Sequence, residues 1–392
     1  MAASAIGVVC GLIGTMFHFG VHEVTAFRGT HPWVLYLLPL AGFVIVSFYK
    51  LTETDGLGTD DIIDAVHEGK RLPILLLPAI FFGTVLTHLC GGSAGREGAA
   101  LQMGGTIGQC MGRTFRLDDR DLRVATLAGM AAFFSALFGT PLAATVFAIM
   151  VISIGVLYHV ALYPSLLAAL VAYGVSVRLG VEPTRFTVAV PDQSVGMFVR
   201  VAALGVLCAL VSILFCKLMH GAGHLMKRIK NPWLRVICGG FAVIALTWIF
   251  GTDYNGAGMD VIAAAMQGHA RPEAFALKML FTVLTMTTGY KGGEIVPAMF
   301  IGATAGCVLD DLFGLAPGLG AAVGLLGMFC GSLNCPISAI FLGVEMFGGA
   351  NIQYYAIAAA ISFMLSANFG LYKEQKIVYS KIRAEFINRY TD

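Results

Sequence analysis

Glu97 is the residue of this sequence with the clearest chemical potential, and it lies in the glycine-rich stretch GGSAGREGAALQMGG of residues 91–105. Only 12% of the 392 residues are charged and 57% are hydrophobic, so a carboxylate in these surroundings is costly and needs a reason. An ionised carboxylate can occupy the place of an anion, and a protonated one can vacate it, which couples anion movement to proton movement. The structural alternative is that Glu97 caps a helix or pairs with Arg96.

A second acid, Glu294, has a similar setting in the segment KGGEIVPAMF of residues 291–300. Two acids near one site shift each other's proton affinity, so at least one of them is expected to hold its proton near neutral pH. A protonated carboxyl can also donate a hydrogen bond to an anion. The alternative for Glu294 is an N-cap role, because an acid is favoured at a helix start.

Long apolar runs surround both acids and recur along the whole chain, whose mean hydropathy is +0.81. A membrane span needs about 20 apolar residues, or fewer if it is broken or re-entrant. We therefore predict a single integral membrane domain over residues 1–392. Clusters of Lys and Arg in residues 113–123, 217–230 and 373–389 are predicted to face the cytoplasm. The net charge of +2 argues against a nucleic-acid partner.

No group of residues in the sequence has the spacing of a metal or cofactor site. The nine cysteines are scattered and odd in number, which disfavours a disulfide framework. His18 and His22, like His220 and His224, are four residues apart but lack a HExxH frame. We expect no metal and no cofactor, and no serine elbow or GxGD motif supports an intramembrane enzyme.

The chain contains an internal repeat at an offset of about 200 residues. Three segments match in the same order, namely residues 54–69 with 254–269, 95–108 with 293–306, and 127–147 with 325–341. The sequence therefore predicts two related halves, residues 1–185 and 195–392.

In both halves a glycine-rich stretch precedes an apolar helical run, so we predict helices that begin abruptly inside the membrane. Such a helix start exposes free N–H groups and a positive dipole end. Unwound backbone at that depth is tolerated only where it lines a cavity or is buried in protein. Paired broken helices at corresponding positions of two halves indicate a transport site, and their N-termini would converge on an anion.

The same segments resemble the CLC family of chloride channels and proton-coupled anion antiporters. GREGAALQ is similar to the family motif GREGPxxQ, GLGTDD stands where the family has GSGIPE, and GGEIVP resembles GxFxP. FGTPLAATVFAIM and YSKI resemble the family's NAPLAGxLF segment and the segment of its central tyrosine. The resemblance implies an all-α integral membrane fold, an inverted repeat of broken and re-entrant helices, in a homodimer whose subunits each carry a pore.

Departures from the family pattern resemble its fluoride/proton antiporter (CLC-F) subgroup. Leu57 replaces the chloride-binding serine, Ala99 replaces the proline after GREG, and Glu294 is an additional acid. The inner proton-transfer glutamate of chloride exchangers and the cytosolic nucleotide-binding domains have no counterpart here. Some members place Thr two residues after the additional acid, where this chain has Val296. The resemblance implies fluoride/proton antiport that exports fluoride across a bacterial inner membrane, and the alternative is a chloride channel or chloride/proton exchanger of the same fold.

The resemblance also implies which residues carry the function. Glu97 and Glu294 would act in gating and proton coupling, and the Tyr379 hydroxyl would be a donor at the inner end of the anion site. The anion site as a whole is predicted to comprise Gly56, Leu57, Gly95, Arg96, Glu97, Gly98, Glu294, Ile295, Val296 and Tyr379. The expected partners are fluoride, protons, the lipid bilayer and a second copy of the chain.

Five further residues have structural interpretations. Pro141 and Pro336 each open an apolar run and suit the first position of a helix. Asp60 and Asp61 are predicted to cap a short helix after Gly58. Glu345 lies late in an apolar helix, where pairing with a Lys or Arg, a packing role and a dimer role all remain open.

Overall fold

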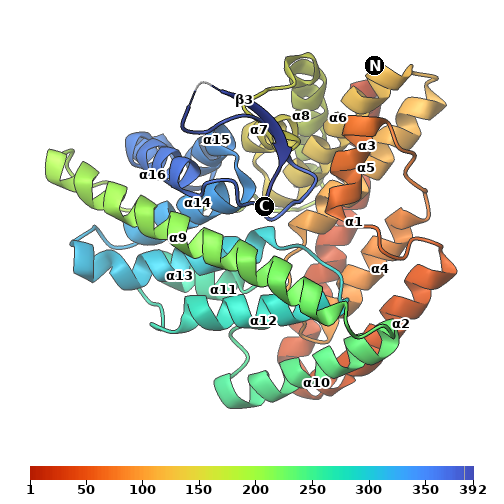
Figure 1. Ribbon diagram of the computed structural model, residues 1–392, viewed down its shortest axis with the longest axis horizontal. Helices are drawn as coiled ribbons and strands as arrows, with labels where there is room; N and C mark the ends of the chain where they lie inside the picture. The colour runs from red at the N-terminus through yellow and green to blue at the C-terminus, as the bar shows by residue number, and fades with distance from the viewer. Residues whose placement is uncertain (384) are drawn as a thin grey trace.

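The computed structural model describes residues 1–383 and 385–392 and is mainly helical (Figure 1). The helices of the first half are α1 (Ala2–Thr30), α2 (Leu38–Leu51), α3 (Thr59–Glu68), α4 (Leu76–Leu89), α5 (Glu97–Thr114), α6 (Asp119–Phe138), α7 (Pro141–Met150) and α8 (Leu162–Arg178). Those of the second half are α9 (Val195–Met226), α10 (Pro232–Phe250), α11 (Met259–Met266), α12 (Ala274–Thr288), α13 (Ile295–Phe313), α14 (Leu319–Leu333), α15 (Pro336–Phe347) and α16 (Ile352–Leu365). Short 3₁₀ turns, Pro32–Leu37, His159–Ala161 and Gly349–Asn351, connect some of them.

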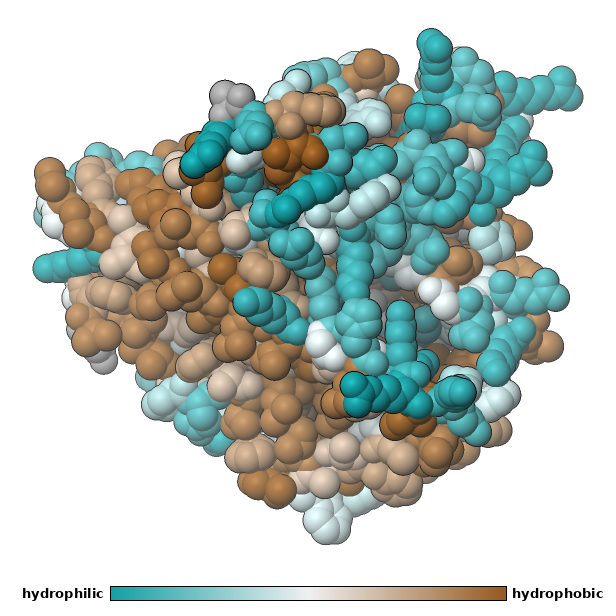
Figure 2. Space-filling view, viewed as in Figure 1, coloured by the Kyte–Doolittle hydropathy of each residue, from teal (hydrophilic) through white to brown (hydrophobic). Residues whose placement is uncertain are grey.

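Six helical segments are long and apolar enough to cross a membrane, namely Ala2–Thr30, Pro32–Leu51, Asp119–Phe138, His159–Arg178, Val195–Met226 and Pro232–Phe250. Large apolar side chains such as Phe241, Trp248 and Val160 are exposed on the surface. In Figure 2, hydrophobic residues cover the left and lower parts of the view, whereas hydrophilic residues gather at the upper right. These features agree with the predicted integral membrane fold.

Helix pairs at corresponding places in the two halves cross with their backbones in contact. In α5 and α6, a Cβ added at Gly104 would lie 2.3 Å from the carbonyl oxygen of Gly129. In α13 and α14, a Cβ added at Gly302 would lie 2.2 Å from the carbonyl oxygen of Gly324. Glycine, which has no side chain, allows this close approach of two helices, as is typical of packed membrane helices. Part of the glycine content thus serves helix packing.

A small sheet, which the all-helical prediction did not include, holds the C-terminal segment. Strand β2 (Lys376–Tyr379) pairs in parallel with β1 (Ser153–Ile154) and antiparallel with β3 (Phe386–Tyr390). The Gln375 side chain donates hydrogen bonds to the carbonyls of Val151 and Leu333. These bonds tie the C-terminal segment to the ends of α7 and α14.

The expected helix starts are largely confirmed. Pro141 and Pro336 occupy the first turns of α7 and α15. The Asp61 carboxylate accepts a hydrogen bond from the Gly58 N–H at 2.8 Å, which caps α3. The prediction for Asp60 is wrong, because its carboxylate instead accepts from the Glu374 N–H at 3.3 Å in the C-terminal segment.

Glu345 caps a helix other than its own. Its two carboxylate oxygens accept hydrogen bonds from the N–H groups of Leu142 at 3.0 Å and Ala143 at 2.8 Å, at the start of α7. The first N–H groups of a helix have no partner within that helix, and a side-chain acceptor satisfies them. Of the three roles left open by the sequence, the contacts support packing between α15 and α7.

Glu345→Ala should therefore lower the free energy of unfolding by about 1–2 kcal/mol, because two helix-start donors lose their acceptor. Thermal unfolding of the detergent-solubilised protein measures the loss. Glu345→Gln keeps one carbonyl acceptor and should lose less stability than the Ala variant. Equal unfolding temperatures for wild type and Glu345→Ala would contradict the capping role.

Candidate functional site

The starts of α5 and α13 meet in the interior, as the repeat predicts for corresponding segments. Gly95 and Gly293 form an antiparallel bridge, with N–H to carbonyl distances of 2.7 and 2.8 Å in the two directions. A Cβ at Gly293 would lie 2.3 Å from the backbone nitrogen of Gly98, so only glycine permits this approach. Two helix N-termini consequently present their free N–H groups to one region.

The Glu97 side chain is 1% exposed and folds back over the start of its own helix. Its Oε2 accepts a hydrogen bond from the Arg96 N–H at 2.8 Å, and its Oε1 lies 3.6 Å from Arg96 Nε. A Cβ at Gly95 would be 2.6 Å from Glu97 Oε2, so the carboxylate occupies the space beside that glycine. A negative group therefore already occupies the region at which the helix start points.

Arg96 has a second partner that sequence reasoning missed. Its Nη1 lies 3.0 Å from Nδ1 of His18 on α1. Because a guanidinium can only donate, this contact requires an unprotonated His18 Nδ1. The sequence offered only a His pair four residues apart, which gave no indication of contact with residue 96.

Glu294 immediately precedes α13 and lies beside the start of α5. A Cβ at Gly98 would be 3.4 Å from Glu294 Oε2. The charges of Asp60 and Lys291 act on the Glu294 carboxyl, and Lys291 Nζ lies 4.1 Å from the ring centroid of Tyr49. The structure thus brings Glu294 close to the helix that begins with Glu97, and it adds Asp60 and Lys291 to their surroundings.

The remaining residues of the predicted anion site are distributed over three segments. Ile295 and Val296 are buried in the first turn of α13. Gly56 has a left-handed φ of 85° in the loop before α3, and Leu57 in the same loop is partly buried against the core. Helix α3 packs against α5, and Gln102 Nε2 of α5 donates to Thr59 Oγ1 of α3 at 3.0 Å. A hydroxyl is therefore present two residues after Leu57.

Tyr379 does not lie where the sequence resemblance placed it. Its side chain is 47% exposed on β2, and its ring packs against Phe386. Tyr372 is instead 4% exposed, and the charges of Glu294 and Asp60 act on its hydroxyl. Burial raises the pKa of Asp60 to about 6. Tyr372, seven residues earlier in the chain, is thus the buried tyrosine near these acids.

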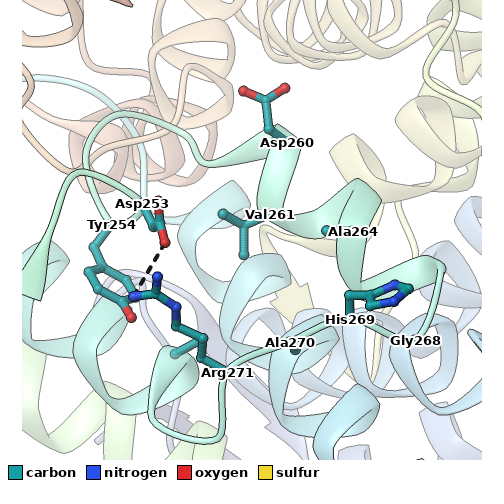
Figure 3. A pocket seen from close by; sticks show the side chains of 10 residues that line it. Asp253, Tyr254, Asp260, Val261, Ala264, Gly268, His269, Ala270 and Arg271 are labelled. Atoms are coloured by element: carbon teal, nitrogen blue, oxygen red, sulfur yellow. Dashed lines mark ion pairs between the residues drawn. The ribbon is translucent and has the colours of Figure 1, made fainter.

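A surface cavity of about 520 Å³ lies apart from these acids. Figure 3 shows its lining, in which Arg271 points toward Asp253 beside the ring of Tyr254. The closest atoms of Arg271 and Asp253 are 3.7 Å apart. Since neither Glu97 nor Glu294 lines this cavity, it is not the site described above.

Comparison with known proteins agrees with this architecture. A family profile described as voltage-gated chloride channel matches residues 40–367. A chloride/fluoride channel protein of Pseudomonas syringae pv. tomato is 36% identical over 391 residues, which cover 97% of this chain and 86% of the relative. An H⁺/Cl⁻ exchange transporter of Vibrio vulnificus is 26% identical, over 93% of this chain and 84% of the relative.

Solved structures show the same arrangement of helices. The crystal structure of a CLC-type fluoride/proton antiporter matches with a TM-score of 0.93 and 33% identity, over 95% of this chain and 96% of that one. A slow cyanobacterial Cl⁻/H⁺ antiporter matches with a TM-score of 0.82 and 20% identity, over 93% of each chain. The predicted fold class is therefore confirmed.

Proposed function

The chain belongs to the voltage-gated chloride channel (CLC) family, and from this premise we propose that it is a secondary active transporter that exports fluoride in exchange for protons. The observation that carries the proposal is the place of Glu294, an acid beside the helix start of Glu97 at the meeting point of α5 and α13. A permanently ionised acid there would repel a permeating anion. The 36% identical chloride/fluoride channel protein and the 33% identical fluoride/proton antiporter support fluoride as the anion.

Glu97 is proposed to act as both gate and proton carrier. Its carboxylate now accepts the Arg96 N–H at the helix start, so an incoming anion competes for the same positive end of α5. Protonation removes the charge that holds the carboxylate there and lets the anion take its place. Each exchange of carboxylate for anion thus requires a proton on Glu97.

Fluoride requires strong donors because it is small and tightly hydrated. The N–H groups of Ile295 and Val296 on one side and of Glu97 and Gly98 on the other are such donors. A protonated Glu294 adds an O–H donor beside them. No hydroxyl is needed at Leu57, where a chloride-binding relative has serine.

Tyr372→Phe should weaken fluoride transport, because the variant loses one hydroxyl donor and little volume. A hydrogen bond to a charged group contributes about 1.5–3 kcal/mol, so the fluoride concentration for half-maximal transport should rise about 10- to 100-fold. Fluoride efflux from vesicles gives this concentration. Tyr379→Phe is the matched control, because its exposed hydroxyl lies outside the site, and it should transport like wild type. An unchanged Tyr372→Phe would show that this hydroxyl does not reach the anion.

Vesicle efflux also tests the proposed function directly. Vesicles that contain the protein and are loaded with fluoride or with chloride are diluted into anion-free buffer, and anion release and proton uptake are recorded together. Faster fluoride than chloride release with simultaneous proton uptake is expected. Chloride release at the higher rate would favour the chloride exchanger of the same fold, and release without proton uptake would favour a channel.

The proposal places the protein in a bacterial inner membrane as a homodimer with one pore in each subunit. The bacterial sources of the relatives support the bacterial inner membrane, and the family resemblance supports the homodimer with one pore in each subunit. The two predicted repeat halves supply the pore together, since Gly95 of one half bridges Gly293 of the other.

A further inference from the structure

Two cations, the partly buried Arg28 and the fully buried Lys278, lie against the same glycine, Gly256. Lys278 on α12 is 0% exposed, and its Nζ donates hydrogen bonds to the carbonyls of Tyr254 at 3.1 Å and Gly256 at 2.6 Å. Arg28, in the last turn of α1, donates to the carbonyl of His88. A Cβ at Gly256 would lie 3.0 Å from Arg28 Nη2. The ammonium and the guanidinium are therefore neighbours.

Neither cation has a carboxylate partner within the described part of the chain. None of the ion pairs found there includes Arg28 or Lys278. The ionisable group that acts on Lys278 is Arg28 itself, and the one that acts on Arg28 is the Cys90 thiol. Buried charges in proteins are normally paired or bound to ions. This pair of cations thus lacks a counter-charge.

Both cations keep hydrogen-bond donors to spare. An ammonium has three N–H donors, and the two bonds of Lys278 to backbone carbonyls leave one, which lies over the Phe300 ring at 5.0 Å from its centroid. A guanidinium has five N–H donors, of which the His88 carbonyl takes one. The region can therefore donate to a small acceptor.

The imidazole of His88 lies near both cations. Its side chain is 1% exposed, and its Nδ1 bonds the Thr84 carbonyl at 2.9 Å. Its Nε2, at the other end of the ring, is buried and has no hydrogen-bond partner among the described residues. Arg28, Arg96 and Lys278 all act on this imidazole. Because the Thr84 carbonyl can only accept, Nδ1 carries the proton of the neutral ring, and Nε2 is an acceptor that a water molecule would satisfy.

We propose that Arg28, Lys278 and His88 form a second anion site, which holds one fluoride ion on the outer side of Glu97. The identity of the anion rests on the proposed function. Arg28 and Lys278 would donate to the ion directly, and the His88 Nε2, an acceptor, would be joined to it through a water molecule. Arg96 links the two sites, since it pairs with Glu97 and also acts on His88.

The outer placement follows from the direction of α1. The start of this helix, at Met1 and Ile6, lines a pocket with Leu117 and Asp121, which belong to the stretch predicted to face the cytoplasm. Arg28 lies at the opposite end of α1. The cavity of Figure 3 reaches the same loop from the surface, because Tyr254 lines it and the Tyr254 carbonyl also bonds Lys278.

Equilibrium dialysis of the detergent-solubilised protein against fluoride, with a fluoride electrode as the readout, tests the site. The experiment compares a parent protein that carries Glu97→Gln with the same protein that also carries Lys278→Gln, so transport does not contribute to either measurement. Lys278→Gln removes the charge and keeps an N–H donor for the backbone carbonyls. This variant should bind one fluoride fewer per chain in the concentration range that saturates its parent, an affinity loss of about tenfold or more. Equal numbers of bound fluoride would overturn the proposal.

Controls separate a defined site from general electrostatics and from misfolding. Lys381→Gln removes a partly buried lysine, one that bonds Ser366 and Asn334, and should leave the number of bound fluoride ions unchanged. The difference between the parent and Lys278→Gln should persist in 1 M inert salt, where charges are screened beyond about 3 Å. If this difference in bound fluoride vanishes in 1 M salt, the cations only attract anions to the surrounding region and form no defined site, which overturns the proposal. If Lys278→Gln does not elute as a folded protein, Arg28→Gln decides, because it removes the charge of the other cation and should also lose the fluoride.

The dialysis also separates the second site from the proposed function. If the wild type carries chloride rather than fluoride in vesicles, the proposed function fails. In that case dialysis against chloride should still show one ion fewer in Lys278→Gln. If fluoride transport is confirmed and the count is unchanged, only the second site fails.

Discussion

Glu97→Gln should reduce proton movement to the level of vesicles without protein. The amide keeps the shape of the side chain and can still fill the space beside Gly95, but it cannot take up or release a proton. In the structure the carboxylate accepts the Arg96 N–H at the start of α5, where we propose that an anion competes with it. Without protonation there is no cycle in which the two alternate. Proton uptake under an outward fluoride gradient is the measurement.

The exposed acid Glu273 provides the matched control for this variant. Glu273→Gln makes the same chemical change at an exposed position just before α12, and it should move fluoride and protons at the wild-type ratio. Size-exclusion profiles of both variants establish that the proteins are folded. Proton uptake of wild-type size in Glu97→Gln would contradict its role as the proton carrier, and Glu97 would then be a helix-capping acid that interacts with Arg96.

The starts of the broken helices could be predicted because local signals define them. The glycines before Glu97 and the prolines at 141 and 336 restrict where a helix can begin, and the structure begins α5, α7 and α15 at these residues. The small sheet could not be predicted in the same way. Its strand β1 has only two residues, too short for an alternating pattern, and it depends on pairing with a segment more than 200 residues later.

The choice between Tyr372 and Tyr379 shows how a short motif can mislead. Both tyrosines lie in the same lysine-rich segment, and YSKI at residues 379–382 has the closer resemblance to the family's tyrosine segment. The pairing of β2 with β1 fixes which side chains of this segment point inward. This pairing leaves Tyr379 exposed, whereas Tyr372 is buried just before the sheet begins. A tertiary contact, not the local sequence, determines which of the two tyrosines is buried.

The residues of the proposed second anion site were beyond the reach of sequence analysis for a related reason. Arg28, His88 and Lys278 come from three helices and belong to no shared motif. Each is a single polar residue in an apolar segment, where snorkelling to the membrane surface is the usual expectation. Only the approach of the Gly256 loop to α1 and α12 places them together. Glu97 was found because glycines surround it, and these residues have no such local signal.

Glu294 variants should show the second large effect, and they distinguish a fluoride/proton antiporter from a simple anion channel. An ionised carboxylate beside the anion path would repel a permeating ion by several kcal/mol at low effective dielectric. The acid is tolerable there only if it is neutral during part of the cycle. The charge of Asp60 disfavours the ionised form of this carboxyl, and the charge of Lys291 favours it.

Glu294→Ala should therefore cut fluoride turnover far more than an exposed substitution would, while the protein stays folded. Glu294→Gln is the sharper test, because the amide keeps the shape and a donor but cannot exchange a proton. It should still bind fluoride in dialysis and yet fail in coupled transport. Glu345→Gln changes another acid of the second half, one that caps α7, and should affect stability but not coupling. If Glu294→Gln exchanges fluoride for protons at the wild-type rate, Glu294 acts only as the N-cap of α13, and the choice of fluoride would then rest on similarity to relatives alone.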